Sequence, residues 1–328
     1  MVPLAANPYP VVIGSGALGE LGGFLTGTAV AVADRAVPTF PELDLPTLVV
    51  AGGEAAKTLA GLESLLEGLE RHRVGRDGTV VAVGGGTVGD LAGFAASVWL
   101  RGVAIVQVPT TLLAMVDSAI GGKTGVNTRS AKNAIGTFWQ PRAVLADTRF
   151  LATLPRAQLE GGWAEVVKYA MTLDPGIAGL DDLEEVVERC VRCKAGVVAA
   201  DEREAGPREV LNYGHTIGHA IEAASGYSVH HGRAVAAGMG AAVRVSAAVG
   251  LCDRGLVDAQ DRLLRRHGLP GTLPRLSVEK VLAATAGDKK ARGGRARWVL
   301  LRGMGQAEAG HEVPDGVVRE AVAEILSA

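Results

Sequence analysis

Two histidines stand four residues apart in the segment NYGHTIGHAIE, residues 212 to 222. The segment has helical character, so His215 and His219 should share one face of a helix, a spacing that presents two imidazole nitrogens to one zinc ion. Thr216 follows the first histidine, so the general-base glutamate of a protease-type H-E-x-x-H motif is absent. The spacing indicates metal chemistry but leaves the function of each histidine open.

A glycine-rich turn follows a β-branched run in VVAVGGGTVGDLAGF, with the G-x-G-x-x-G spacing at Gly84, Gly86 and Gly89. Backbone amides of such a turn, with the start of the next helix, can hold a pyrophosphate, although a turn without a ligand would look similar. The turn follows roughly the fourth strand, and Gln107 stands where a ribose-binding acid is usual. Ribose acids would therefore come from other strand ends, where Asp34 and Glu54 are placed.

The segment VDSAIGGKTGVNTRSAKNAIGTFWQP is a glycine-rich loop region that carries charged and amide side chains, namely Asp117, Lys123, Lys132 and Asn133. Such a region suits a phosphate-bearing ligand. Solvated loop lysines would give the same pattern, so these residues alone do not establish a site.

The elements that position these residues change in character near residue 150. Before it, the short runs PVVIG, AVAVAD, TLVVA, TVVAVGGG, VAIVQVPTT and AVLAD alternate with helical stretches, of which LESLLEGLERHRV is the clearest. This alternation predicts a parallel, doubly wound sheet. After it, long segments rich in Ala, Val and Glu predict a mainly α-helical domain, with one strand at residues 295 to 303 that indicates a late hairpin or a return to the first domain. We predict an α/β Rossmann-like domain over residues 1–152 and a helical domain over residues 153–328.

Composition limits the classes of function. The chain has 328 residues, is 48% hydrophobic, and has a net charge of -2 and a pI near 6.4, so nothing favours nucleic-acid binding. It contains neither an uncharged apolar run of about 20 residues nor a signal-peptide start, which predicts a cytoplasmic protein without a membrane span. The pair Cys190 and Cys193 lies in a segment of helical spacing with no second pair, so we expect a structural role.

Several long motifs occur in a recognisable order: WAEVVKYA, GPREVLNYGHTIGHAIE, HHGRAV and GDKKARGGRARWVLL. With the glycine turn and the cation-rich segment, they resemble the 3-dehydroquinate synthase family, within the sugar phosphate cyclases, over nearly the whole chain. The resemblance implies an NAD-binding α/β domain, a helical domain with a divalent metal (Zn²⁺ or Co²⁺), a site in the cleft between them, and a homodimer. It implies conversion of 3-deoxy-D-arabino-heptulosonate 7-phosphate to 3-dehydroquinate and phosphate by transient oxidation, elimination, reduction and aldol closure.

The resemblance also implies residue roles. The metal ligands would be Glu165, His215 and His231, with the adjacent His230 exposed or outside the ligand set. Two histidines and one carboxylate leave coordination positions open for substrate.

Other roles concern substrate and nucleotide. The substrate carboxylate would contact Lys194 and Arg208, and the ring hydroxyls Asp117 and Lys168. The phosphate would contact Lys123, Asn133, Asn212, His219, one lysine of DKK (Lys289 in preference to Lys290), and Arg101 of a second subunit. The NAD contacts would be Asp34, Glu54, Lys57, Gly85, Gly86, Asp90, Thr110, Thr111 and Lys132.

Three alternatives stay open at this point. A related sugar phosphate cyclase would differ at the carboxylate-binding positions. A metal-dependent polyol dehydrogenase of the glycerol type shares the two-domain plan but has no use for so many cations. A catalytically inactive binding or scaffold paralogue conflicts with a full set of metal-binding and anion-binding residues.

Overall fold

The computed structural model describes residues 1–4, 7–38, 43–129, 131–204, 206–269, 271–273, 276–291 and 297–327, apart from the side chains of residues 286–291. Its packing divides the chain into two compact units. The first unit comprises Met1–Leu159 and Asp182–Arg203, and the second comprises Glu160–Asp181 and Glu204–Ala328. The boundary between residues 152 and 153 stays a prediction, and helix α4 (Leu183–Ala200), which follows it in sequence, belongs to the first unit by its packing.

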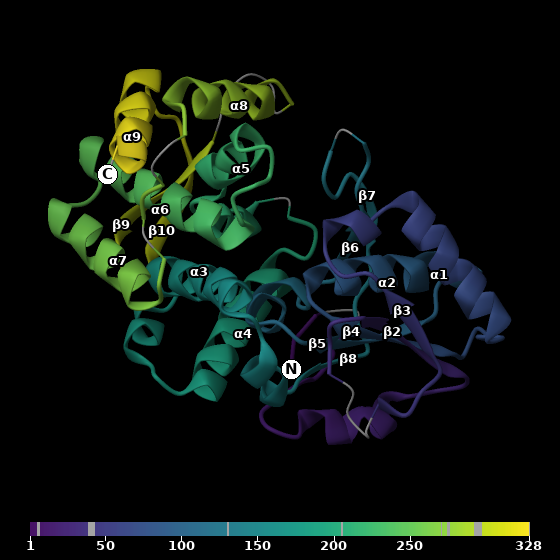
Figure 1. Ribbon diagram of the computed structural model, residues 1–328. Helices are drawn as coiled ribbons and strands as arrows, with labels where there is room; N and C mark the ends of the chain where they lie inside the picture. The colour runs from purple at the N-terminus through teal and green to yellow at the C-terminus, as the bar shows by residue number, and fades with distance from the viewer. Residues whose placement is uncertain are drawn as a thin grey trace. The chain divides into compact units, whose positions relative to one another are not determined.

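A six-stranded parallel sheet forms the centre of the first unit (Figure 1). Its strands are β1 (Val11–Ile13), β2 (Ala29–Asp34), β3 (Thr47–Val50), β4 (Thr79–Gly84), β5 (Ala104–Pro109) and β8 (Ala143–Ala146). Neighbours pair in parallel in the order β1-β8-β5-β4-β2-β3. The six apolar runs of the sequence are these six strands, which confirms the predicted parallel α/β architecture.

Helices α1 (Leu59–Arg71) and α2 (Gly86–Val98) pack on this sheet. Residues two apart on a strand face the same side, so Val80 and Ala82 of β4 both lie in the core that the two helices cover. Thr58 is the N-cap residue of α1, and its side chain accepts a hydrogen bond from the Gly61 amide at 3.0 Å. The clearest helical pattern in the sequence is thereby confirmed.

The order of the strands identifies where the sheet can bind a ligand. From β2 the chain goes to β3 at one edge, whereas from β4 it goes to β5 on the other side. Parallel sheets bind ligands at the carboxyl ends of strands where the direction of winding reverses, here between β2 and β4. Asp34 ends β2, and Gly85 follows β4.

The segment expected to be a glycine-rich loop region differs from that prediction. Strands β6 (Lys123–Val126) and β7 (Ile135–Phe138) form an antiparallel pair there. A Cβ atom at Gly136 would lie 2.0 Å from the carbonyl oxygen of Thr124, so the close pairing requires glycine. Glycine is usually depleted in strands, which is why the sequence pattern favoured a loop.

The second unit is mainly helical (Figure 1). Its elements are α3 (Arg156–Thr172, from Glu160), η7 (Pro175–Gly179), η8 (Pro207–Asn212), α5 (His215–Ala224), α6 (His231–Ala248), α7 (Arg254–Arg266), α8 (Val278–Ala291), β9 (Trp298–Gly303), β10 (Gln306–His311) and α9 (Asp315–Ser327). Strand β9 pairs antiparallel with β10, which confirms the late hairpin. Among the helices of the described residues, none is both long enough and apolar enough to cross a membrane.

Shorter helical turns complete the first unit, namely η1 (Ala17–Phe24), η3 (Glu54–Ala56), η4 (Trp99–Arg101), η5 (Ala114–Ser118) and η6 (Thr148–Thr153). The turn η5 is a π-helix that contains Asp117. Such turns inside or beside helices are frequent at functional sites.

Candidate active site

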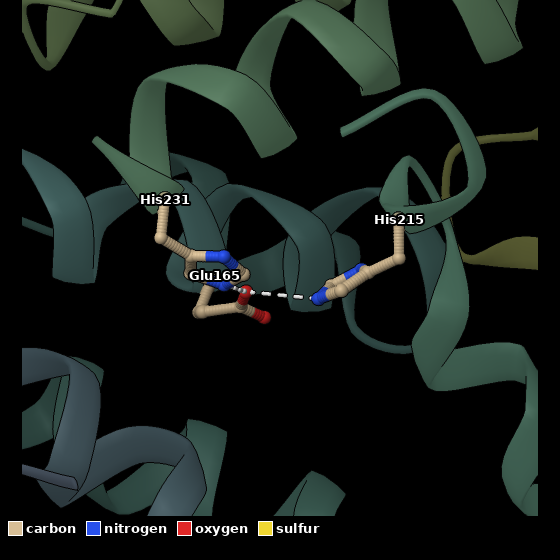
Figure 2. Close-up of side chains that lie close together, drawn as sticks. All are labelled: Glu165, His215 and His231. Atoms are coloured by element: carbon tan, nitrogen blue, oxygen red, sulfur yellow. Dashed lines mark ion pairs between the residues drawn. The ribbon is translucent and has the colours of Figure 1, made fainter. Parts of the chain in front are cut away.

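Glu165 of α3, His215 of α5 and His231 of α6 converge in the second unit (Figure 2). The Nε2 atom of His215 lies 3.5 Å from Oε1 of Glu165, and that of His231 lies 3.7 Å from the same oxygen. One potential ligand atom of each residue lies within 4.8 Å of the others. The fold therefore brings together the three side chains that the resemblance identified as a metal site.

Glycines allow the three helices to approach closely enough for this arrangement. A Cβ atom at Gly238 of α6 would lie 2.0 Å from the carbonyl oxygen of Gly214, which precedes α5. A Cβ atom at Gly232 would lie 2.3 Å from Cα of Gly161 on α3. Both histidines are the first residues of their helices, so a side chain at either contact would move the ligands apart.

The protonation of both histidines follows from what their Nδ1 atoms contact. Nδ1 of His215 lies 3.2 Å from the carbonyl oxygen of Tyr213, and Nδ1 of His231 lies 3.2 Å from Oε2 of Glu222. Both oxygens only accept hydrogen bonds, so each Nδ1 donates its proton to one of them and each Nε2 is left facing Glu165, where a metal could bind. Two such nitrogens and a carboxylate fit Zn²⁺ or Co²⁺ and leave coordination positions for a substrate.

Glu165 is ionised although it is almost completely buried, with 1% of its surface exposed. Burial acts to raise the pKa of this carboxyl, but the ammonium of Lys168 and the imidazole of His215 outweigh burial and hold the pKa well below its usual range. Lys168 forms an ion pair with the Glu165 carboxylate one helical turn away. The carboxylate is therefore available as an anionic ligand at neutral pH.

Zinc affinity of the metal-free protein is expected to rise about tenfold per pH unit between pH 7 and 9. Burial acts to lower the pKa of His231, but contacts with Glu165 and Glu222 raise it to about 9. Below that pH the ring holds a second proton, which zinc must displace from Nε2, and above it this competition ends. Zinc titration against a competing chelator at several pH values tests this, and an affinity constant across that range would contradict it.

His219 lies beside this cluster with an exposed side chain. Its ring centroid is 5.4 Å from that of His215 and 6.2 Å from that of His231. A second possible donor set, His219, Glu222 and His231, also has its ligand atoms within 4.8 Å of one another. In that set, however, Glu222 contacts the Nδ1 atom of His231 and not the Nε2 atom that faces Glu165.

The nucleotide-binding candidates of the first unit form a network. Nζ of Lys57 lies 2.5 Å from Oδ2 of Asp90 and 2.5 Å from Oδ1 of Asn133. The Asn127 side chain donates to Glu54 at 2.6 Å and accepts from the Asn133 amide at 2.8 Å. This network connects the end of β6 with helix α2 and the η3 turn.

The glycine turn after β4 lies against hydroxyl side chains. A Cβ atom at Gly86 would lie 2.7 Å from Oγ of Ser118, and one at Gly85 would lie 3.1 Å from Cγ2 of Thr111. The third glycine of the motif, Gly89, packs directly on Gln107, whose side chain donates to the Gly89 carbonyl at 3.2 Å. Gln107 stands in the sequence where a ribose-binding acid is usual, but its side chain is used to support helix α2.

Two residues expected near the substrate also meet within the first unit. Nζ of Lys194 on α4 lies 2.5 Å from Oδ1 of Asp117. Lys194 is buried, so the carboxylate compensates a cation that burial would otherwise destabilise.

Comparison with known proteins identifies the family. The family models for the N-terminal and C-terminal parts of 3-dehydroquinate synthase match residues 47–161 and 162–291. The chain belongs to the 3-dehydroquinate synthase family. A 3-dehydroquinate synthase of Synechococcus sp. (strain CC9605) is 42% identical, over 99% of this chain and 95% of that protein.

Solved structures of related cyclases agree with the fold. A 2-deoxy-scyllo-inosose synthase complexed with carbaglucose-6-phosphate, NAD⁺ and Co²⁺ has a TM-score of 0.88 at 29% identity, over 96% of each chain. A 2-epi-5-epi-valiolone synthase of Streptomyces hygroscopicus subsp. jinggangensis 5008, with NAD⁺ and Zn²⁺ bound, has a TM-score of 0.87 at 27% identity, over 98% of each chain.

The remaining residues that the family resemblance pointed to belong to both units. Arg208 is buried in η8, which ends at Asn212, and the Asn212 side chain donates to Glu204 at 3.4 Å. Arg101, Lys123 and Lys132 are exposed on the first unit, and Thr110 is buried after β5. His230 precedes α6 and is exposed. The side chains of Lys289 and Lys290 lie outside the described part of α8.

Sequence reasoning missed Glu222, Tyr213 and Asn127. Glu222 follows His219 by three residues in the same motif and so shares its helix face, a signal that could have found it. Tyr213 acts through its backbone carbonyl, and no pattern of residue types reveals such a contact. Asn127 directly follows the β6 strand, in the segment that had been interpreted as a loop.

Proposed function

We propose that this protein converts 3-deoxy-D-arabino-heptulosonate 7-phosphate to 3-dehydroquinate and phosphate, with NAD⁺ and a divalent metal as cofactors. The observation that carries the proposal is the convergence of two imidazole Nε2 atoms on the buried Glu165 carboxylate, in a chain of this family. The metal would be held by Glu165, His215 and His231. Support for a phosphorylated sugar as substrate comes from the solved relative that binds carbaglucose-6-phosphate, NAD⁺ and Co²⁺.

Bound metal supplies a Lewis acid that lowers the pKa of a substrate hydroxyl and acidifies the neighbouring C–H once a ketone exists. NAD⁺ supplies a temporary acceptor for the hydride that is removed and later returned. Within the protein, the Lys168 ammonium holds Glu165 ionised and can donate a hydrogen bond to a ring hydroxyl. His219, exposed beside the cluster, can donate to the substrate phosphate and accept a proton during elimination.

Cationic and amide side chains would bind the anionic ends of the substrate. We assign the substrate carboxylate to Lys194 and Arg208, and the phosphate to Lys123, Asn133, Asn212, His219 and Lys289. Lys194 and Asn133 already have protein partners, Asp117 and Lys57, at 2.5 Å each. Such partners hold the side chains in one orientation before a ligand arrives, which lowers the ordering cost of binding.

The nucleotide would occupy the carboxyl ends of β2, β4 and β5. The proposed contacts are Asp34 and Glu54 for the ribose, the turn at Gly85 and Gly86 for the pyrophosphate, and the side chains of Lys57, Asp90, Thr110, Thr111 and Lys132. Two observations support these contacts. The glycine turn lies at the start of the 13-residue helix α2, and it lies at the point of the sheet where the direction of winding reverses.

We also propose a homodimer in which Arg101 reaches the partner's phosphate site. Leu100 and Arg101 have φ angles of 50° and 69°, a conformation that costs energy in residues other than glycine and is common at functional positions. Gly102 follows and packs against the Trp139 ring, and the apolar side chains of Val98, Leu100 and Phe138 are exposed. Exposed apolar residues just before an exposed arginine in the chain fit an interface between copies of the chain.

Phosphate release is expected to require NAD⁺ without any accumulation of NADH, because oxidation and reduction occur on one bound substrate. Purified protein with zinc, NAD⁺ and the heptulosonate phosphate should release phosphate while the absorbance of NADH stays flat. A hexose 6-phosphate that lacks the carboxylate serves as the matched control and should release none. Stoichiometric NADH formation would contradict the proposal and favour a dehydrogenase.

A further inference from the structure

Glu222 lies in the last turns of α5 and directs its carboxylate at a proposed metal ligand. Its Oε2 atom is 3.2 Å from Nδ1 of His231, and 6% of its surface is exposed. The His231 side chain is 35% exposed, against 14% for His215, so packing alone restricts the His231 ring less.

The two histidines are held by different kinds of acceptor. His215 contacts the backbone carbonyl of Tyr213, and the buried Tyr213 hydroxyl in turn donates to Oε1 of Gln260 on α7 at 2.5 Å. No substitution removes a backbone carbonyl. His231 instead depends on one side chain, which a substitution can remove.

We propose that Glu222 is a positioning residue for the metal, because its carboxylate accepts the Nδ1 proton of His231 and keeps Nε2 facing Glu165, where the metal would bind. This inference rests on the metal site of the proposed function. The carboxylate fixes the ring orientation and the tautomer, and its charge makes Nε2 a stronger donor. Loss of such a partner typically weakens metal binding about 10- to 100-fold.

The second donor set leads to a different expectation. If His219, Glu222 and His231 bound the ion, Glu222 would be a ligand and His219 would be required for metal binding. With Glu222 as a positioning residue, His219 is dispensable for metal binding, and a Gln at position 222, which still accepts a hydrogen bond, retains part of the affinity.

Zinc affinity of the full-length, metal-depleted protein, measured against a competing chelator above pH 9, where a proton on Nε2 of His231 no longer competes with zinc, is the test. We expect Glu222→Gln to weaken zinc binding about tenfold and Glu222→Ala about a hundredfold, with an altered visible spectrum of the Co²⁺ form in both. Glu160→Gln is the matched control. It removes a buried carboxylate of α3 that pairs at 3.2 Å with Arg233, in the first turn of α6, and that belongs to neither candidate donor set, so the affinity of this variant should stay within about twofold of wild type.

Each outcome has one meaning. Equal affinities of wild type and both Glu222 variants would overturn the inference while leaving the metal site intact. A larger loss in His219→Ala than in Glu222→Gln would overturn it in favour of the second donor set. Wild-type protein that binds no zinc, or His215→Ala that binds it normally, would instead refute the proposed metal site.

A second measurement keeps the inference testable if the Glu222 variants do not fold. Zinc-loaded wild type should show a low-field Nδ1–H resonance in histidine-selective NMR that disappears in His231→Ala. Absence of that resonance from wild type would overturn the inference.

Discussion

His219→Ala protein is expected to keep its zinc and NAD⁺ but to lose phosphate release by a factor of about 10² to 10⁴, the range for loss of a general acid or base. His215→Ala and His231→Ala are expected to lose the zinc itself. The physical reason lies in the direction of the nitrogen atoms, since Nε2 of both His215 and His231 faces the same buried carboxylate oxygen. Four protein ligands would close a tetrahedral site and leave no position for substrate.

Metal content and NAD⁺ binding of the three purified variants, measured beside phosphate release, decide between the two histidine assignments. His230→Ala is a suitable control, because His230 is exposed and precedes α6 without belonging to either donor set. It should retain zinc and activity. A zinc-free His219→Ala protein would show that the pair at residues 215 and 219 is a chelate, and the assignment made here would be wrong.

The fold of the first unit followed from its sequence because buried parallel strands are continuous apolar runs. AVAVAD and TVVAVG are flanked by turns and helices, so neither can be mistaken for an exposed segment. The antiparallel pair formed by β6 and β7 could not be predicted in this way. Their pairing depends on Gly125 and Gly136 facing each other across the ladder, and a single-residue pattern does not contain that contact.

The metal site shows a similar division. Residue spacing alone drew attention to His215 and His219, which are neighbours on one helix, whereas His215 and His231 meet only because α5 and α6 cross at glycines. Only the family resemblance indicated that His215 and His231 act together, because residue periodicity carries no information about contacts between different helices. The partners of the Nδ1 atoms, a backbone carbonyl and the Glu222 carboxylate, became apparent only with atomic positions.

Arg101→Ala and Lys123→Ala homodimers are each expected to lose about a hundredfold or more in kcat/KM, since in the proposed site each would remove a charged hydrogen bond to phosphate. Refolding a one-to-one mixture should then restore about a quarter of wild-type activity, because half of the randomly formed dimers are mixed and each has one intact site. The intact site combines Lys123 of the Arg101→Ala chain with the arginine of the Lys123→Ala chain. Mixed dimers isolated through two different tags should have about half of wild-type activity.

The mixing experiment separates the dimer proposal from a simple loss of stability. If Arg101 acted within its own chain, one site of the mixed dimer would lack the arginine and the other the lysine, and no activity would return. Arg101→Lys tests the chemistry of the same position, because an ammonium keeps the charge but not the planar, bidentate geometry of guanidinium, so partial activity is expected. Inactive mixed dimers, shown by their tags to have formed, would restrict Arg101 to a role in its own subunit and contradict the shared site.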